Sequence, residues 1–481
     1  MDETRGKMKW DVDDRLALSA ESMREMGYRV VDIVAENFAT LAERPVSLTG
    51  SRAALEAALR EPAPARPRAP EEVLEIVRDV VLENMIHVDH PRNFGFVPGP
   101  SNYVGALADF LTAGFNVFAG TWLEASGPAQ IEIVTIDWLK ELCGLPASAR
   151  GLFVSGGSAA NLTSLMIARQ EKLPDGPAGG VAYCSDQTHS SMERAFRILG
   201  FGVGQLRRIE TDSRYRLSLN ALRKAIDEDR ADGKRPFCVI ANAGTTNTGA
   251  VDPLPELSDL CRREDLWLHA DGAYGAVAVL SPTYRHLLEG LGNVDSLSLD
   301  PHKWLFQPYE IGCVLMRDGE LLTKHLEAHP EYLQDVKAGA EEVNFCDLGF
   351  QLTRQFRALK LWMTIQLFGL DHIRAAVERG IRAAEKAETY ARGHEELEVV
   401  SAAELGVVSF RYLAKSSDDL NAFNLALSKA VIVDSFCLAS STAIRGKVVL
   451  RMCTINPRTT DDDLRKTVER IVEIGRRLDG S

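Results

Sequence analysis

Five short apolar runs alternate with helical patterns between about residue 100 and residue 370. Each run is rich in β-branched or aromatic residues, has the length of one strand and is apolar on both faces. Such strands form a mostly parallel sheet that helices cover on both sides, and ligands of such sheets bind at the strand ends. The pattern predicts an α/β fold, with strands at residues 151–155, 181–184, 237–241, 266–270 and 311–316.

The chain on either side of this region has a different character. Apolar residues from Met23 to Leu41 recur at helical spacing and predict an amphipathic helix, and the prolines of residues 62–70 predict a linker. A helical pattern over 352–391 precedes strand-like runs and a last helix over 461–478. We therefore expect three parts: an N-terminal helical segment (1–95), a large domain (96–370) and a smaller C-terminal α+β domain (371–481).

Charge and cysteine use exclude several function classes. The net charge of -13 leaves no excess of positive charge for a nucleic acid partner. Residues 1–15 lack the apolar run of a signal peptide and no later stretch is long enough to span a membrane, so a cytoplasmic protein is expected. The eight cysteines are scattered, with no Cys-x-x-Cys pair, which indicates core thiols and no metal site.

A glycine-containing turn follows the first predicted strand. Residues 155–161 read Ser-Gly-Gly-Ser-Ala-Ala-Asn and open a helical run. Two glycines let backbone amides approach a phosphate, and the helix N-terminus adds free donors and positive potential. The spacing fits neither the Walker motif nor the dinucleotide fingerprint, so a nucleotide is disfavoured. Ordinary turn chemistry is the other interpretation.

Three polar side chains also follow predicted strands. Asp271 ends a buried run, where it either caps the next turn or holds a proton on the ring nitrogen of a pyridine cofactor. Lys303 lies in an apolar context, which suits a lysine bound to an aldehyde cofactor. His189 supplies an imidazole that is either solvated or stacked on a cofactor. Together with the glycine turn, they predict one cofactor site.

At these residues the sequence resembles the group II pyridoxal-phosphate-dependent decarboxylases, which include the aromatic-L-amino-acid, histidine and glutamate enzymes. The resemblance covers nearly the whole chain and implies fold type I, the aspartate aminotransferase fold, with a mostly parallel seven-stranded sheet in the large domain. The stretches that carry it are residues 90–95, 136–139, 186–191, 243–246, 269–274, 301–304 and 354–362.

The resemblance also implies roles for individual residues. Lys303 becomes the lysine that binds pyridoxal 5'-phosphate (PLP) covalently, Asp271 the partner of the pyridine nitrogen, and His189 the residue stacked on the ring. The implied activity is decarboxylation of an L-amino acid to an amine by a homodimer, with the N-terminal helices packed on the partner subunit. Five further residues are implied around the cofactor: Thr246 and Ala273 at the ring, and Gly157, Ser158 and His302 at the phosphate.

Two positions depart from the aromatic members of the family. Phe345 aligns, without gaps, with a loop tyrosine near the final proton transfer, and phenylalanine there accompanies aldehyde formation in related synthases. Tyr332 fills the position if the alignment contains a gap. Asp300 replaces an asparagine beside the phosphate. Because a carboxylate near a dianion is unfavourable, we leave Asp300 outside the phosphate set.

The substrate is expected to be an aromatic or large apolar amino acid. The leading hypothesis is decarboxylation to the amine, and the alternative is decarboxylation with oxidative deamination to an aldehyde. An aminotransferase, a carbon–sulfur lyase or a noncatalytic protein of the same fold is disfavoured, because residues 300–304 match the decarboxylases. The predicted substrate pocket, which a dimer interface could also explain, consists of Phe96, Pro98, Phe118, Gly120 and Phe345.

Overall fold

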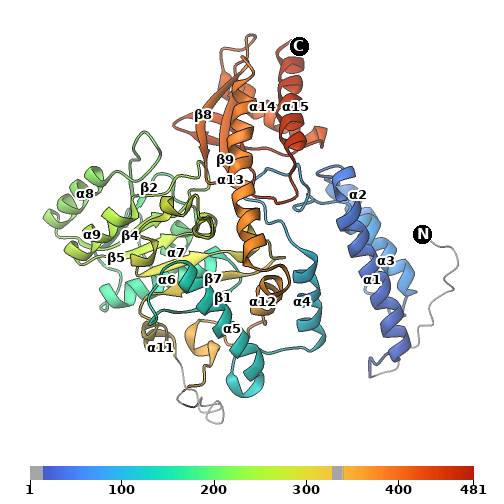
Figure 1. Cartoon of the computed structure of the whole chain (residues 1–481), viewed down its shortest axis with the longest axis horizontal. Helices are drawn as coiled ribbons and strands as arrows, with labels where there is room; N and C mark the ends of the chain where they lie inside the picture. Colours follow the sequence, from blue (N-terminus) through green and yellow to red (C-terminus); the bar gives the residue numbers. More distant parts are fainter. Residues whose placement is uncertain (1–14, 328–338, 340, 481) are drawn as a thin grey trace.

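The N-terminal helices lie beside the rest of the chain in the computed structural model, which describes residues 15–327, 339 and 341–480 (Figure 1). Helix α1 (Ala20–Thr40) begins where the Ser19 side chain accepts a hydrogen bond from a backbone amide of the first turn. The proline-containing segment between α2 (Arg52–Leu59) and α3 (Pro70–Ile76) has no regular structure. Pro70 stands at the first position of α3, where a missing amide donor costs nothing.

A seven-stranded sheet forms the centre of the large domain. Its strand order is β1-β7-β6-β5-β4-β2-β3, and only β7 runs antiparallel to its neighbours. The mostly parallel seven-stranded sheet expected from the sequence is thereby confirmed. The strands are β1 (Arg150–Val154), β2 (Gly180–Ser185), β3 (Leu206–Ile209), β4 (Arg235–Asn242), β5 (Trp267–Asp271), β6 (Ser296–Leu299) and β7 (Gly312–Met316).

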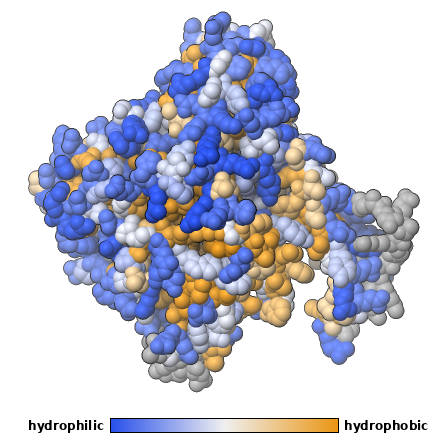
Figure 2. Space-filling view, in the orientation of Figure 1, coloured by the Kyte–Doolittle hydropathy of each residue, from blue (hydrophilic) through white to orange (hydrophobic). Residues whose placement is uncertain are grey.

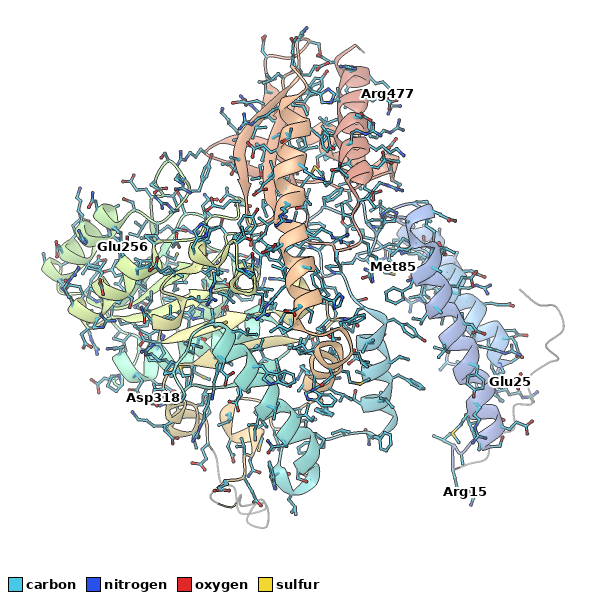
Figure 3. All side chains as sticks on the ribbon, in the orientation of Figure 1. Arg15, Glu25, Met85, Glu256, Asp318 and Arg477 are labelled. Carbon is cyan, nitrogen blue, oxygen red and sulfur yellow. The ribbon has the colours of Figure 1, made fainter. Side chains whose placement is uncertain are left out.

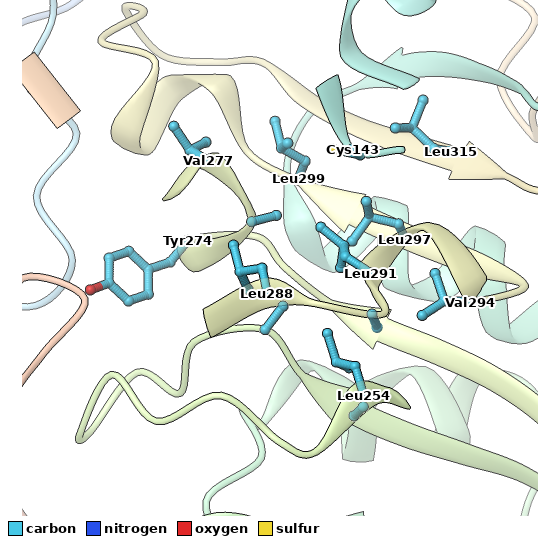
Figure 4. Close-up of a cluster of buried hydrophobic side chains, with 14 of the residues drawn as sticks. Cys143, Leu254, Tyr274, Val277, Leu288, Leu291, Val294, Leu297, Leu299 and Leu315 are labelled. Atoms are coloured by element: carbon cyan, nitrogen blue, oxygen red, sulfur yellow. The ribbon is translucent and has the colours of Figure 1, made fainter. Parts of the chain in front are cut away.

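Two buried clusters cover the two faces of this sheet. Successive residues of one strand enter different clusters, as Leu152 and Phe153 of β1 do. The cluster of Phe153 joins the sheet to one set of helices, and Figure 4 shows part of it around Leu297 and Leu299. That set comprises α5 (Trp122–Leu142), α8 (Leu219–Ala231), α9 (Leu254–Glu264) and α12 (Ala358–Phe368), while the other face carries α6 (Gly157–Lys172), α7 (Ser191–Ile198) and α11 (Glu320–Leu326).

A second, antiparallel sheet builds the C-terminal part, with strand order β10-β11-β9-β8. Helix α13 (Leu370–Arg392) runs from the large sheet to this smaller one (Figure 1). The long helix predicted over 352–391 is broken at Gly369, whose φ of 74° suits glycine. The remaining elements are β8 (Leu397–Glu404), β9 (Val407–Tyr412), α14 (Leu420–Asp434), β10 (Ser440–Ile444), β11 (Lys447–Cys453) and α15 (Asp461–Asp479).

Apolar side chains also gather on the surface beside the N-terminal helices (Figure 2). Helix α4 (Tyr103–Gly114) exposes Phe110, and Phe115 just after it is 81% exposed. Helix α12 contributes Leu367 and Phe368 to the exposed apolar residues. Within the described residues, every helix is too short or too polar to cross a membrane.

Candidate active site

A cavity of about 300 Å³ lies where the carboxyl ends of β1, β2, β4, β5 and β6 meet. Parallel strands place their carboxyl ends at one edge, so residues distant in sequence converge there. The structure brings together all eight cofactor residues expected from the sequence: Gly157, Ser158, His189, Thr246, Asp271, Ala273, His302 and Lys303.

Close packing at the end of β1 explains the glycine turn. A side chain at Gly157 would place its Cβ 2.8 Å from Asp300 Oδ2 and 3.0 Å from the Ala273 Cβ. On β7, a Cβ at Gly312 would lie 2.4 Å from the Gly156 Cα. Helix α6 starts at Gly157, and its first amides have no acceptor within the helix. The turn therefore offers backbone donors and a positive helix end to an anion.

Three hydrogen bonds fix the carboxylate of Asp271 at the end of β5. Its Oδ1 accepts from the Ala273 amide at 3.2 Å and from Ser298 Oγ at 3.2 Å. Its Oδ2 accepts from Asn161 Nδ2 at 3.2 Å. Hydrogen bonds of this kind stabilise the charged form of a buried carboxylate. Asp271 is therefore suited to hold a proton on a ring nitrogen.

Lys303 points at a second carboxylate. Its Nζ lies 3.1 Å from Asp300 Oδ2, and 24% of the lysine side chain is exposed. Desolvation lowers the pKa of Lys303, but the carboxylates of Asp300 and Asp271 more than offset this, so the pKa is raised. Asp300 Oδ1 is buried without a hydrogen-bond partner. Asp300, which we left out of the phosphate set, thus lines the same cavity and faces the lysine.

Two histidines present neutral rings to the cavity. His302 Nδ1 accepts from the Ile311 amide at 3.3 Å, and desolvation lowers its pKa. His189 is exposed at the cavity wall, and its Nδ1 accepts from the Ser191 amide at 3.2 Å. Partial desolvation lowers the pKa of His189 as well. Both rings are therefore able to pack or donate without adding positive charge.

Several residues that sequence reasoning missed support this cavity. Asn161 and Ser298 hold Asp271, and Ser298 is the register partner of Asp271 on the adjacent strand. Only knowledge of the strand pairing would have revealed Ser298. Arg451 of β11, which the sequence left without a role, donates to the carbonyl oxygens of Thr246 and Phe96. Arg451 thereby links the smaller sheet to the cavity residue Thr246 by a hydrogen bond.

None of the five residues expected in a substrate pocket lines this cavity. Phe96 is 64% exposed, and Phe118 packs against Gly120, where a Cβ would lie 2.5 Å from the ring. Pro98 is buried elsewhere. Phe345 is buried in the cluster that α6 shares with the sheet, 5.0 Å from the Arg354 guanidinium. Tyr332 lies outside the described residues.

The place of Phe345 in the substrate pocket stays a prediction, and its apolar ring explains why it lies in the core and not at the wall of this cavity. Core burial and the cation–π contact with Arg354 favour the interior over a polar cavity wall.

The donor set of the cavity fits PLP. The turn at Gly157 suits the phosphate, Asp271 suits the pyridine nitrogen and the Lys303 amine suits the aldehyde. Within the residues described, no group of three or more histidine, cysteine or acidic side chains is arranged to hold a metal ion.

Comparisons with known proteins agree with this chemistry. Residues 53–413 match the model of the pyridoxal-dependent decarboxylase conserved domain. The chain is 48% identical to an aromatic-L-amino-acid decarboxylase of Bacillus atrophaeus, over 96% of this chain and 97% of that protein. It is 30% identical to a phenylacetaldehyde synthase of Arabidopsis thaliana, over 95% and 96% of the two chains. The structure of Oryza sativa TDC with PLP and tryptamine superposes with a TM-score of 0.91 at 28% identity, covering 96% of this chain and 99% of that one.

Proposed function

The chain belongs to the group II PLP-dependent decarboxylases, and from this premise we propose that it converts an aromatic L-amino acid to the corresponding amine and carbon dioxide. One observation carries the proposal. An amine, a carboxylate held by three donors and a glycine turn at a helix N-terminus line a single cavity at the carboxyl edge of the sheet. Each group suits a different part of the cofactor.

Each residue of the cavity has a different role toward the cofactor. PLP, when bound, supplies a protonated pyridine ring that accepts the electron pair left by departing carbon dioxide. Asp271 would hold the proton on the ring nitrogen, and the Lys303 amine would hold the cofactor through its aldehyde. His189 would pack against the ring, and the amides at Gly157 and Ser158 would bind the phosphate, with His302 beside them.

The aromatic substrate class is supported by the close relative from Bacillus atrophaeus, which is an aromatic-L-amino-acid decarboxylase. The exposed ring of Phe96 supports the same class, because Arg451 binds the carbonyls of both Phe96 and the cavity residue Thr246. We keep Phe96 as a candidate wall of the substrate pocket, while the roles expected for Pro98, Phe118 and Gly120 stay predictions.

A cytoplasmic homodimer is the assembly we propose. Exposed aromatic residues on α4 and the separate N-terminal helices offer apolar surface that a second subunit would cover (Figures 1 and 2). Predicted boundaries at residues 95 and 370 would make residues 1–95 the dimerisation segment.

Product analysis tests the activity. The purified protein would be incubated with PLP and L-phenylalanine, L-tyrosine or L-tryptophan in air, while oxygen is recorded and products are identified by mass spectrometry. We expect the amine and carbon dioxide in equal amounts, without oxygen consumption. No product from any aromatic amino acid would refute the substrate class.

The same experiment distinguishes a decarboxylase from an aldehyde synthase. Such an enzyme would consume one oxygen molecule and one water molecule per turnover and release an aldehyde, ammonia and hydrogen peroxide with the carbon dioxide. The similarity to a phenylacetaldehyde synthase is what raises this alternative. The burial of Phe345 outside the cavity favours the amine.

A further inference from the structure

A buried chain of hydrogen bonds runs behind the cavity from β5 and β6 to Asp271 and His189. Trp267 Nε1 donates to Ser296 Oγ at 2.9 Å, and Ser296 Oγ lies 2.9 Å from His269 Nδ1. His269 Nε2 lies 3.1 Å from Asn161 Oδ1. The amide nitrogen of Asn161 donates to Asp271 Oδ2 at 3.2 Å and to Ser191 Oγ at 3.1 Å. Ser191 Oγ in turn lies 3.0 Å from His189 Nδ1.

The direction of each bond follows from the two ends of the chain. An indole nitrogen can only donate, so Ser296 Oγ accepts from Trp267, which leaves the serine proton free to point toward His269 Nδ1. Burial lowers the pKa of His269 to about 4, so the ring is neutral and carries one proton. With Nδ1 accepting from Ser296 Oγ, that proton lies on Nε2. This proton meets Asn161 Oδ1.

The other end gives the same answer independently. An ionised carboxylate can only accept, so Asp271 requires the amide nitrogen of Asn161 on its side. Asn161 then presents its oxygen to His269, which must donate. The side chains of Asn161, His269 and Asp271 are almost fully buried, so each of their polar atoms needs a hydrogen-bond partner. A rotated Asn161 amide would put an oxygen against the carboxylate.

We propose that His269 is a positioning residue that, through Asn161, locks the carboxylate of Asp271 and fixes the hydrogen-bond direction at His189. This inference rests on the proposed function, because Asp271 is the assigned partner of the ring nitrogen. His269 does not itself line the cavity; it acts through its hydrogen bond to Asn161, which does. A single neutral histidine thus fixes the orientation of the Asp271 carboxylate and the direction of the hydrogen bond at His189.

The first test reads proton positions without any variant. Histidine labelled with ¹⁵N is incorporated into the cofactor-free protein, and two-bond ¹H–¹⁵N spectra report the tautomer of each ring. We expect His269 and His189 to carry their proton on Nε2. A proton on Nδ1 of His269 would overturn the proposal.

The second test compares the affinity for PLP with that for its analogue that has carbon in place of the ring nitrogen. The wild type should prefer PLP, because only PLP engages Asp271. In His269→Leu and Asn161→Leu this preference should fall by about tenfold or more, the weight of a hydrogen bond to a charged group. His269→Gln, which keeps a donor for Asn161, should restore much of it.

Thr163→Val provides a matched control on the same helix, because it removes a buried hydroxyl that bonds only the Ala159 carbonyl. Thr163→Val should therefore keep the wild-type preference for PLP over the analogue. An equal loss of affinity for PLP and for the analogue in His269→Leu would mean that His269 only fills space in the core, and it would overturn the proposal. If the wild type shows the expected preference but no decarboxylation, the proposed function fails while the positioning role stands.

Discussion

At the scale of single residues, the contact between Lys303 and Asp300 controls how much of the lysine is present as the free amine. Lys303 must lose a proton before its nitrogen can attack the cofactor aldehyde, yet Asp300 Oδ2 lies 3.1 Å away and favours the charged amine. Asp300 contributes most to raising the pKa of Lys303, against desolvation. The free amine is therefore scarce at neutral pH and becomes more abundant as pH rises.

Asp300→Asn should accelerate cofactor attachment. Removing the carboxylate lowers the pKa of Lys303, and each unit increases the free amine about tenfold below that pKa. Stopped-flow absorbance of the lysine-bound cofactor, recorded without substrate between pH 7 and pH 9, measures the rate. The wild-type rate should rise with pH, and the variant should be about tenfold faster throughout.

Glu310→Gln is the control for this experiment. Glu310 lines the same cavity, but its carboxylate pairs with Arg357 at 2.8 Å. Its loss should leave the attachment rate within about twofold of wild type, since the groups that raise the pKa of Lys303 are Asp300, Asp271 and Tyr309. An Asp300→Asn variant that loads no faster than wild type would show that Asp300 does not hold the lysine proton.

Phe345→Tyr should change stability and not the product. The ring is 2% exposed within the core, so a hydroxyl there should cost about 1–3 kcal/mol in the free energy of unfolding. Urea unfolding measures that cost, and mass spectrometry measures the ratio of amine to aldehyde. A changed product ratio would place the side chain at the reacting atoms instead.

At the scale of elements, one buried ion pair joins the parts that carry the cavity. Arg354 Nη2 contacts Glu132 Oε1 of α5 at 2.6 Å and the Phe153 carbonyl of β1 at 2.8 Å. Its Nη1 donates to the Ala119 carbonyl at 2.8 Å. Both charged side chains are almost fully buried. The pair thereby fixes β1, whose end forms the glycine turn, against α5 and the segment before α12. Figure 3 shows all side chains of the described residues on the ribbon.

Arg354→Ala should destabilise the protein strongly. Removing one partner leaves Glu132 buried and unpaired, which costs about 3–5 kcal/mol. Arg374→Ala, which breaks an exposed pair with Asp371 on α13, should cost less than about 1 kcal/mol. Denaturant unfolding of both variants provides the comparison, and equal costs would contradict the structural role of the buried pair.

The sequence predicted the strands that are apolar on both faces, because their pattern is local. It did not predict β3 or β6, since Leu206–Ile209 is partly exposed and Ser296–Leu299 alternates with serine. The motif residues of the cavity were likewise local signals. Asn161 and Ser298 escaped notice because their role depends on strand register and on contacts between distant segments.

At the scale of the whole molecule, the N-terminal helices and the apolar surface beside them predict that a second subunit covers this surface. Helix α1 exposes Met23 and Tyr28, and α4 with the residue after it exposes Phe110 and Phe115. A monomer rarely leaves so much apolar surface in water.

Light scattering should therefore report twice the chain mass of 52.9 kDa. Phe110→Asp combined with Phe115→Asp should shift the mass toward the monomer, because charges would have to be buried at the interface. Val433→Asp, an exposed apolar position on α14, should keep the dimer. A wild-type protein that is monomeric at micromolar concentration would refute the proposed assembly.

Release of carbon dioxide should depend on Lys303 as the lysine that holds the cofactor, and labelled carbon tests this most directly. The wild type and Lys303→Ala would each be given PLP and an aromatic L-amino acid carrying ¹³C in its carboxyl group, and labelled carbon dioxide would be measured. We expect one labelled carbon dioxide for each amine in the wild type, and neither the lysine-bound cofactor absorbance nor labelled carbon dioxide above background in the variant. Wild-type rates in Lys303→Ala would contradict the account.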